Sequence, residues 1–434
     1  MSPFTKKALI ILGVIVLAFM FIPSDLFFLA LIALIVLGFF IATFYFIYIF
    51  AFKSDEKKNI TNEEGPRLVV MVNETNFPDS AFCNWLLNQE YVIKGAIFDN
   101  AIEKIIEIDV SRQSIESLKG IEYFTALKKL DCSDNNLEIL DVSNNTHLQE
   151  LSCANNQLSS LDVCNNKDLQ ELRCNSNQLT SLDVSNNTKL QTLRCKENLL
   201  TSLDVCNNKD LQELQCNSNQ LTSLDVSNNT KLKTLWCNDN LITSLDVSKI
   251  KDLQELMCNS NQISSLDVSN NTKLQTLWCN DNLLTSLDVS TNKELQALGC
   301  SGLSSLDVSM NTKLQNLCCN NCSLTSLDVS NNTNLKALNC NKSDMVSLDV
   351  SKNIALKILS CEINKLTSLD LSKNTELEQL YCKSNQLTSL DISTNTKLAM
   401  LTCSNNQFTK LDVSNNPNLI YLNGRLISQK KPKQ

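Results

Sequence analysis

Cysteine is the residue type with the most chemistry to offer in this chain, because a thiolate can ligate a metal, attack an electrophile or enter a disulfide. Nineteen cysteines occur among 434 residues, and most of them follow one register. Successive members are 21 residues apart, except for one step of 19 residues between Cys300 and Cys319. The register comprises Cys132, Cys153, Cys174, Cys195, Cys216, Cys237, Cys258, Cys279, Cys300, Cys319, Cys340, Cys361, Cys382 and Cys403. Such regular spacing favours a structural column of reduced, buried thiols over a set of reactive sites.

One place in this register could hold a thiol or metal site. Cys319 and Cys322 form a CxxC pair, a spacing found in zinc sites and in redox proteins. A zinc site would normally show a second pair, and a redox pair normally begins a helix, so this site is only a third alternative. His147 is the only histidine, and the eight glycines form no phosphate-binding loop. We therefore predict no enzyme, no metal and no cofactor.

Two polar columns accompany the cysteines. An asparagine follows most register cysteines by three residues, as Asn156 follows Cys153, and is expected to point inward and bond to turn backbone. An aspartate recurs in every turn from Asp141 to Asp412, and neighbours about 5 Å apart would repel one another. We expect hydrogen bonds from turn N–H groups or hydroxyls to compensate, and a string of bound cations is the alternative.

These columns require an element that repeats every 21 residues. In the turn 190–210, Leu193 and Cys195 alternate inward, and Leu203 and Val205 do so again ten residues later. The pattern predicts two short strands per turn, stacked into a solenoid of about fifteen turns. Because no helix widens the outer side, we expect a rod of slight curvature about 70 Å long.

The motif L-x-x-L-x-C-x-x-N-x-L followed by L-D-V-S-x-N resembles the leucine-rich repeat, in particular the irregular bacterial class with 21-residue turns of two half-repeats. The resemblance covers residues 105–423. The preceding segments 77–87 and 118–124 look like the entry region of bacterial surface proteins of this family. Relatives often carry an acidic calcium-type loop between them, but 92–96 contains no carboxylate, so no calcium site is expected. The resemblance implies binding or adhesion rather than catalysis.

The position between the strand leucine and the register cysteine must face away from the core. Two of the three tryptophans in the chain occupy it, two turns apart, with a methionine between them. Their indoles should lie about 10 Å apart in an exposed strip, and aromatic and arginine side chains commonly anchor interfaces. Duplication of a 42-residue unit is the alternative origin of the repeated tryptophan. We hypothesise that this face binds a protein, or a glycan, through Trp236, Met257, Trp278, Arg173, Arg194 and Tyr381.

Residues 1–52 are predicted to form transmembrane segments, as a helical hairpin of 8–22 and 26–52. Lysines flank both outer ends of the hairpin but not its loop, so the positive-inside rule predicts a two-pass protein of the cell membrane with cytoplasmic repeats. If 8–22 does not span, the repeats lie on the extracytoplasmic side. A different class of function also fits this segment, namely a two-helix membrane effector with the repeat array as its sensor.

The predicted fold is a predominantly β repeat solenoid, preceded by a helical cap and transmembrane helices. Its parts are the membrane segment 1–52, a linker 53–66, the cap 67–104, the leucine-rich-repeat solenoid 105–423 and a basic polar tail 424–434. The net charge of −8, with lysines and arginines scattered, argues against a nucleic-acid partner. Our leading hypothesis from the sequence is a membrane-anchored protein that binds its partner through the outward face of the strands.

Overall fold

The computed structural model describes residues 66–426. At the N-terminal end, β1 (Leu68–Met71) pairs antiparallel with β2 (Ala96–Phe98), and two short helices, α3 (Ser80–Leu87) and α4 (Asp99–Ile102), complete a small cap. The predicted helical cap is therefore present but minimal. Asp79 joins it to the repeats, because its carboxylate accepts the N–H of Phe82 in α3 at 2.8 Å and that of Glu116 in the first turn at 2.7 Å.

Each turn of the solenoid contributes one three-residue strand to a parallel sheet, and the strands pair in chain order. The first turn also contains the 3-10 helix η2 (Ile121–Tyr123), and a hairpin of β18 (Tyr421–Leu422) and β19 (Arg425–Leu426) ends the sheet. The parallel strands are β3 (Glu107–Asp109), β4 (Lys129–Asp131), β5 (Glu150–Ser152), β6 (Glu171–Arg173), β7 (Thr192–Arg194), β8 (Glu213–Gln215), β9 (Thr234–Trp236), β10 (Glu255–Met257), β11 (Thr276–Trp278), β12 (Ala297–Gly299), β13 (Asn316–Cys318), β14 (Ala337–Asn339), β15 (Ile358–Ser360), β16 (Gln379–Tyr381) and β17 (Met400–Thr402). Equivalent residues pair, so the predicted solenoid is confirmed.

The prediction of two strands per turn is wrong. Leu203 and Val205 are buried as expected, but they lie in irregular extended chain. On this side the turns are joined through a buried asparagine side chain. Nδ2 of Asn208, for example, donates to the carbonyls of Val184 and Asn187 in the preceding turn at 3.0 and 2.9 Å. Backbone groups satisfied in this way need no strand ladder.

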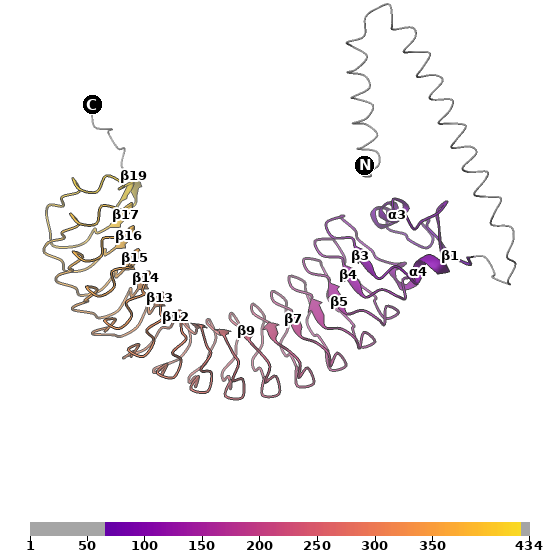
Figure 1. Cartoon of the computed structure of the whole chain (residues 1–434), viewed down its shortest axis with the longest axis horizontal. Helices are drawn as coiled ribbons and strands as arrows, with labels where there is room; N and C mark the ends of the chain where they lie inside the picture. The colour runs from indigo at the N-terminus through magenta and orange to yellow at the C-terminus, as the bar shows by residue number, and fades with distance from the viewer. Residues whose placement is uncertain (1–65, 427–434) are drawn as a thin grey trace, which may run out of the picture. The chain divides into compact units, whose positions relative to one another are not determined.

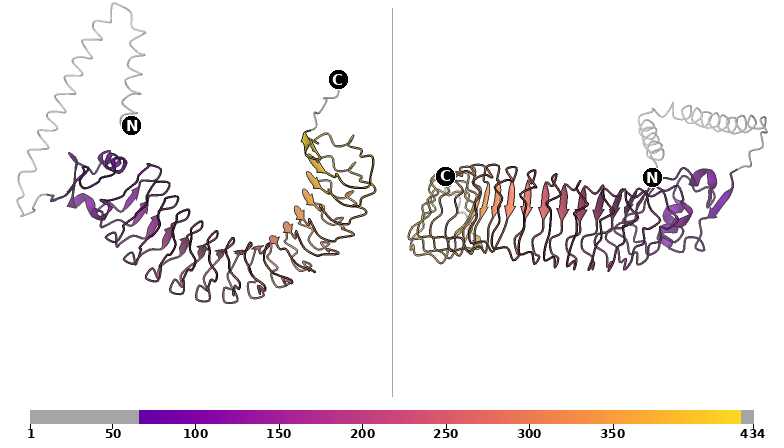
Figure 2. Two further views of the ribbon diagram at one scale, coloured as in Figure 1. Left: turned by 180° about the vertical axis from the view of Figure 1, so that it is seen from behind. Right: turned by 90° about the horizontal axis from the view of Figure 1, so that it is seen from below.

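The repeats form a strongly curved arc with the strands on its concave side, as Figure 1 and Figure 2 show. The expectation of a nearly straight rod is wrong. Backbone hydrogen bonds hold neighbouring strands about 4.8 Å apart on the concave side. Across the outer side, the links through asparagine side chains leave room for a wider spacing, so a helix is not required to bend the array.

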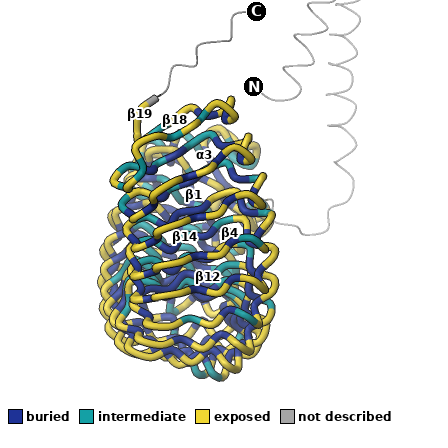
Figure 3. Tube along the Cα trace, turned by 90° about the vertical axis from the view of Figure 1, so that its left-hand side faces the viewer, coloured by how far each residue is buried: buried dark blue, intermediate teal, exposed yellow. Residues whose placement is uncertain are grey.

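The core is a continuous stack of leucine and cysteine side chains. Figure 3 shows the buried segments of the chain alternating with exposed ones from turn to turn. All nineteen cysteines are free, and those of the register are at most 3 % exposed, which confirms the buried column. Burial raises the pKa of Cys195 to about 12. Some thiols donate to the next turn, as Cys279 Sγ does to the carbonyl of Gly299 at 3.3 Å.

Both predicted polar columns are structural. Asn156 donates to the carbonyls of Cys132 and Cys153 at 3.0 and 3.1 Å and accepts the N–H of Leu137 at 2.9 Å. The aspartates accept the backbone N–H two residues on, as Asp183 does from Ser185 at 2.8 Å, and these bonds lower their pKa values. The prediction that turn N–H groups compensate the repulsion between neighbouring aspartates is therefore confirmed.

No helix within residues 66–426 is long and apolar enough to cross a membrane. This finding contradicts the predicted two-pass location in the cell membrane, and the cytoplasmic placement of the repeats that depended on it. The proposed hairpin 8–22 and 26–52, the segment 53–65 and the end of the predicted tail, 427–434, lie outside the described residues.

Candidate binding surface on the concave sheet

The concave sheet places three of the predicted binding residues next to one another on adjacent strands. Met257 on β10 pairs with Trp236 on β9 and with Trp278 on β11, so the three side chains stand side by side as the sequence predicted. Each is half-buried rather than freely exposed. Nε1 of Trp236 is buried without a hydrogen-bond partner. The strip therefore offers less open aromatic surface than the strand alternation suggested.

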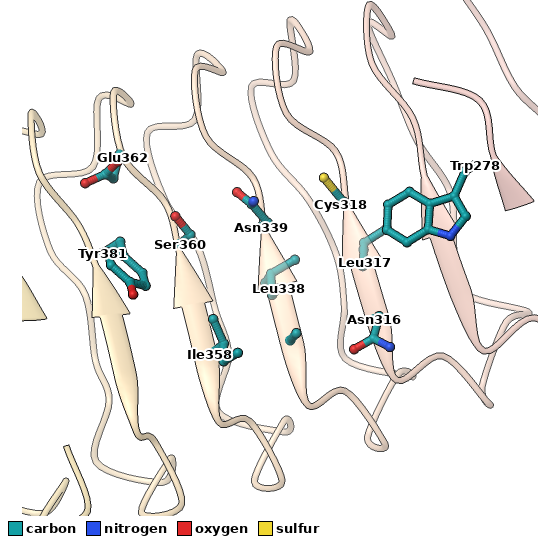
Figure 4. A pocket seen from close by; sticks show the side chains of 11 residues that line it. Trp278, Asn316, Leu317, Cys318, Leu338, Asn339, Ile358, Ser360, Glu362 and Tyr381 are labelled. Carbon is teal, nitrogen blue, oxygen red and sulfur yellow. The ribbon is translucent and has the colours of Figure 1, made fainter. Parts of the chain in front are cut away.

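Beyond Trp278, the residues at the outward position of successive strands are first smaller and then large again. From β12 to β15 they are Gly299, Cys318, Asn339 and Ser360, and on β16 the residue is Tyr381. Cys318, Asn339 and Ser360 line a hollow of about 450 Å³. Figure 4 shows this row, with the Trp278 indole at one end and the Tyr381 phenol at the other. The structure thus brings Trp278 and Tyr381, two of the predicted site residues, to the two ends of one surface depression.

The hollow combines an apolar lining with a few polar groups, most of which already have partners. Ala337 and Ile358 contribute apolar surface at its side. The Tyr381 hydroxyl donates to Oε1 of Gln379 at 3.0 Å, and Oε1 of Glu362 accepts the Thr402 hydroxyl at 2.9 Å. These bonds orient the tyrosine and glutamate side chains before any ligand arrives.

One polar atom of the hollow lacks a partner. Oδ1 of Asn339, midway between the two aromatic ends, is buried and accepts no hydrogen bond from the protein. A buried acceptor without a donor carries a free-energy cost of about 1–3 kcal/mol. A donor group supplied from outside would reach this oxygen only after the Asn339 side chain turns toward the hollow.

Comparison with solved structures identifies proteins of the same architecture. The functional domain of InlJ from Listeria monocytogenes, which includes a cysteine ladder, is 38% identical to this chain, with a TM-score of 0.74, over 79% of this chain and 77% of that one. This chain belongs to the internalin-type leucine-rich-repeat proteins. Residues 146–187 also match a family model of leucine-rich repeats in two copies.

Two further structures share the leucine-rich-repeat fold. The protein LIC12759 of Leptospira interrogans is 27% identical, with a TM-score of 0.59, over 74% of this chain and 84% of that one. An internalin of Listeria monocytogenes, InlF, is 20% identical, with a TM-score of 0.60, over 85% of this chain and its own full length, and this likeness shows the fold alone. No curated protein matches the sequence significantly.

The two predicted arginines of the leucine-rich-repeat sheet lie away from the hollow, on β6 and β7. Arg173 is ion-paired with Glu171. Arg194 forms a two-pronged pair with Glu213, with N–O distances of 2.7 and 3.2 Å, and this hydrogen bonding raises the pKa of Arg194. Their charges are already compensated within the sheet, so the structure does not join these arginines to the aromatic residues as one site.

In the CxxC pair of Cys319 and Cys322, the second cysteine makes its hydrogen bond with Cys300. Cys322 takes the place of a ladder asparagine, and its sulfur is hydrogen-bonded with Cys300 of the preceding turn. This bond, helped by the N–H groups of Leu303 and Gly302, lowers the pKa of the Cys322 thiol. No cluster of three potential metal ligands occurs within residues 66–426. The sequence signal for this contact was the lapse of the asparagine ladder here, with a two-residue deletion after Cys300 and a cysteine, Cys322, at the ladder position of the next turn.

The sequence interpretation also missed a second asparagine column, on the outer side. Its members are buried, at most 4 % exposed, and each donates to two backbone carbonyls of the preceding turn, as described for Asn208. The signal was the asparagine that ends the LDVSxN part of the motif, one in nearly every turn. This column is structural, because its amides are buried and hydrogen-bonded to the backbone.

Proposed function

We propose that this leucine-rich-repeat protein recognises a partner protein through its concave sheet, with the hollow between Trp278 and Tyr381 as the principal contact. The observation that carries the proposal is the hollow itself, which occupies about 450 Å³ on the face that solenoid proteins commonly use for binding. Aromatic side chains at its two ends supply large contact areas at a small cost in side-chain entropy, which is typical of binding hot spots.

The remaining predicted residues have secondary roles in this proposal. Trp236 and Met257 extend the apolar contact toward the N-terminal side of the hollow, because they stand in register with Trp278. Arg173 and Arg194 contribute to the rim of the surface, where paired charges guide association more than they add affinity.

The test compares two double variants of the full chain. Trp278→Ser with Tyr381→Ser removes both aromatic ends of the hollow. Leu241→Ser with Leu283→Ser removes two exposed apolar side chains, 45 % and 63 % accessible, which lie outside the strands and serve as the matched control. Affinity is measured by surface plasmon resonance against a protein captured with the wild-type chain and identified by mass spectrometry.

We expect the aromatic variant to lose at least about tenfold in affinity, equivalent to about 1.4 kcal/mol, and the control to bind as the wild type does. Thermal unfolding of both variants checks that the solenoid is intact. Equal affinity of the aromatic variant and the control would move the contact to another surface. Competition by free oligosaccharides, with no loss from protein competitors, would identify a glycan as the ligand instead.

A further inference from the structure

The concave sheet is divided into two parts of different charge. The outward positions of β3 to β10 carry seven carboxylates and three cationic side chains. From β11 to β17, across seven consecutive strands, the two outward positions of each strand carry no charged residue at all. The hollow lies wholly within this second part, which we call the uncharged half-sheet.

An uncharged surface of this kind discriminates by charge. A charged side chain that entered the hollow would lose its hydration, and the strands beneath it would offer no counter-charge. Glu362 is the one carboxylate at the edge of the hollow, and it already accepts a hydrogen bond from Thr402. Charged groups are therefore disfavoured across the uncharged half-sheet, and apolar groups gain by contact with Trp278, Ile358 and Tyr381.

The hydrogen-bonding groups of the hollow add a second requirement. The partnerless Oδ1 of Asn339 calls for a donor at the middle of the site. The Ser360 hydroxyl is already committed as a donor to Oδ1 of Asn341 at 2.9 Å. A peptide N–H group is a neutral donor that supplies this bond without bringing a charge, whereas a purely hydrocarbon ligand would leave the oxygen unpaired.

The length of the hollow sets the size of the occupant. Trp278 and Tyr381 are five strand steps apart, which corresponds to about 24 Å at about 4.8 Å for each step. An extended peptide covers that distance with about seven residues at about 3.3 Å each. The site therefore matches one extended segment that runs across the strands.

We propose that the uncharged half-sheet binds an extended segment of the partner protein, about seven residues long, that carries apolar side chains and no charge. A backbone N–H of this segment donates to Asn339 Oδ1 once the Asn339 side chain has turned toward the hollow. Charged residues of the partner lie outside this segment, on the side toward β3 to β10, where the sheet provides counter-charges. This inference rests on the proposed function and specifies the chemistry that it selects.

The experiment is a selection of random twelve-residue peptides displayed on phage against the full chain. Ala337→Glu places a carboxylate beside the hollow, and Asn339→Leu removes the free acceptor while keeping similar volume. Leu283→Glu, which adds the same charge at an exposed site outside the strands, is the control. Binding of individual selected peptides is then measured at low and high salt.

We expect the enriched peptides to contain an uncharged apolar run of about seven residues and to bind with little dependence on salt. Ala337→Glu should weaken them at least tenfold, Asn339→Leu should weaken them severalfold, and Leu283→Glu should leave them unchanged. If Ala337→Glu does not fold, Ala337→Asp and Asn339→Leu are compared with the Leu283→Glu control instead.

Two kinds of failure are distinguishable. Charged peptides that are enriched and still depend on Ala337 would overturn this inference and leave the proposed function standing. Peptides that bind the wild type and Ala337→Glu equally well would overturn both. Selection of no sequence, together with binding of this chain to a carbohydrate array, would also overturn the inference.

Discussion

The indole of Trp278 lies directly on Gly299, the residue beside it on the next strand. A Cβ atom on Gly299 would be 2.1 Å from Cε3 of the indole and 2.6 Å from Cζ3, so any side chain there collides with the ring. Trp236, in the equivalent position two turns earlier, has Met257 as this neighbour. The two tryptophans of the repeated unit thus have different surroundings, and only Trp278 has a glycine on which to lie at the edge of the hollow.

Replacing Gly299 with alanine should displace the Trp278 indole. We expect a loss of about 1 kcal/mol in the free energy of unfolding, because the ring can swing outward rather than strain the core, and a red shift in tryptophan emission. Denaturant titration followed by fluorescence measures both. In a Trp278→Leu background the same Gly299→Ala change should cost much less. An equal cost in both backgrounds would show that the indole does not depend on this glycine.

Ile363 is a β-branched residue in a left-handed backbone conformation, with φ 56°. The equivalent residue of other turns is often small or polar, as in Asn155 with φ 54° and Asn405 with φ 56°. Ile363→Asn should therefore stabilise the protein by about 1 kcal/mol, since asparagine tolerates this region far better. The reverse change, Asn155→Ile, should destabilise by a similar amount. Urea unfolding midpoints test the pair, and a loss of stability in Ile363→Asn would contradict the strain argument.

The inner asparagine ladder is interrupted at Ser343, whose hydroxyl is buried without a partner. In the next turn, Asn364 donates to the carbonyls of Cys340 and Cys361 at 2.9 and 3.1 Å and accepts the N–H of Met345 at 3.2 Å. Ser343→Asn should restore such bonds and add about 1 kcal/mol of stability, and Asn364→Ser should remove at least as much. Hydrogen exchange of the amides in these turns locates the effect. Faster exchange in Ser343→Asn would show that the turn cannot accept the amide.

The outward row of aspartates makes the fold sensitive to acid. Hydrogen bonds from Ser185 and its equivalents hold the pKa of Asp183, and of each other member of the row, below the usual 3.8. The folded state therefore binds protons less readily than the unfolded chain. The contribution of these aspartates to stability is fully present above pH 3.8, the usual pKa, and is lost as the pH falls through the lowered pKa values of the folded state. Circular dichroism between pH 7 and pH 2 should show unfolding only at the acid end.

A matched variant separates the hydrogen bond from the charge. Asp225→Asn keeps an oxygen acceptor for the N–H of Ser227, so it should remain close to the wild type at neutral pH and be less sensitive to acid. Stability that rises as the pH is lowered from 6 would show that repulsion along the row outweighs these bonds.

The column of Cys195 and the inward pointing of Asn156 were predictable from the sequence, because each turn of a solenoid contacts its neighbours through equivalent positions. A 21-residue period therefore determines which side chains stack and which face outward. The same reasoning placed Trp236, Met257 and Trp278 side by side. It also predicted a structural role for the aspartates, since their hydrogen bonds to the turn involve only residues that are close in sequence.

Tertiary structure decided what depends on geometry across several turns. The period could not show that Trp278 and Tyr381 enclose one hollow, because that outcome depends on the small residues of four intervening strands and on the bend of the sheet. It could not show that the sulfur of Cys322 is hydrogen-bonded to Cys300 of the preceding turn, because a cysteine at the ladder position has no equivalent in the other turns. A repeat specifies contacts between neighbouring turns, whereas curvature sums a small rotation at every turn and surface hollows arise from differences between turns.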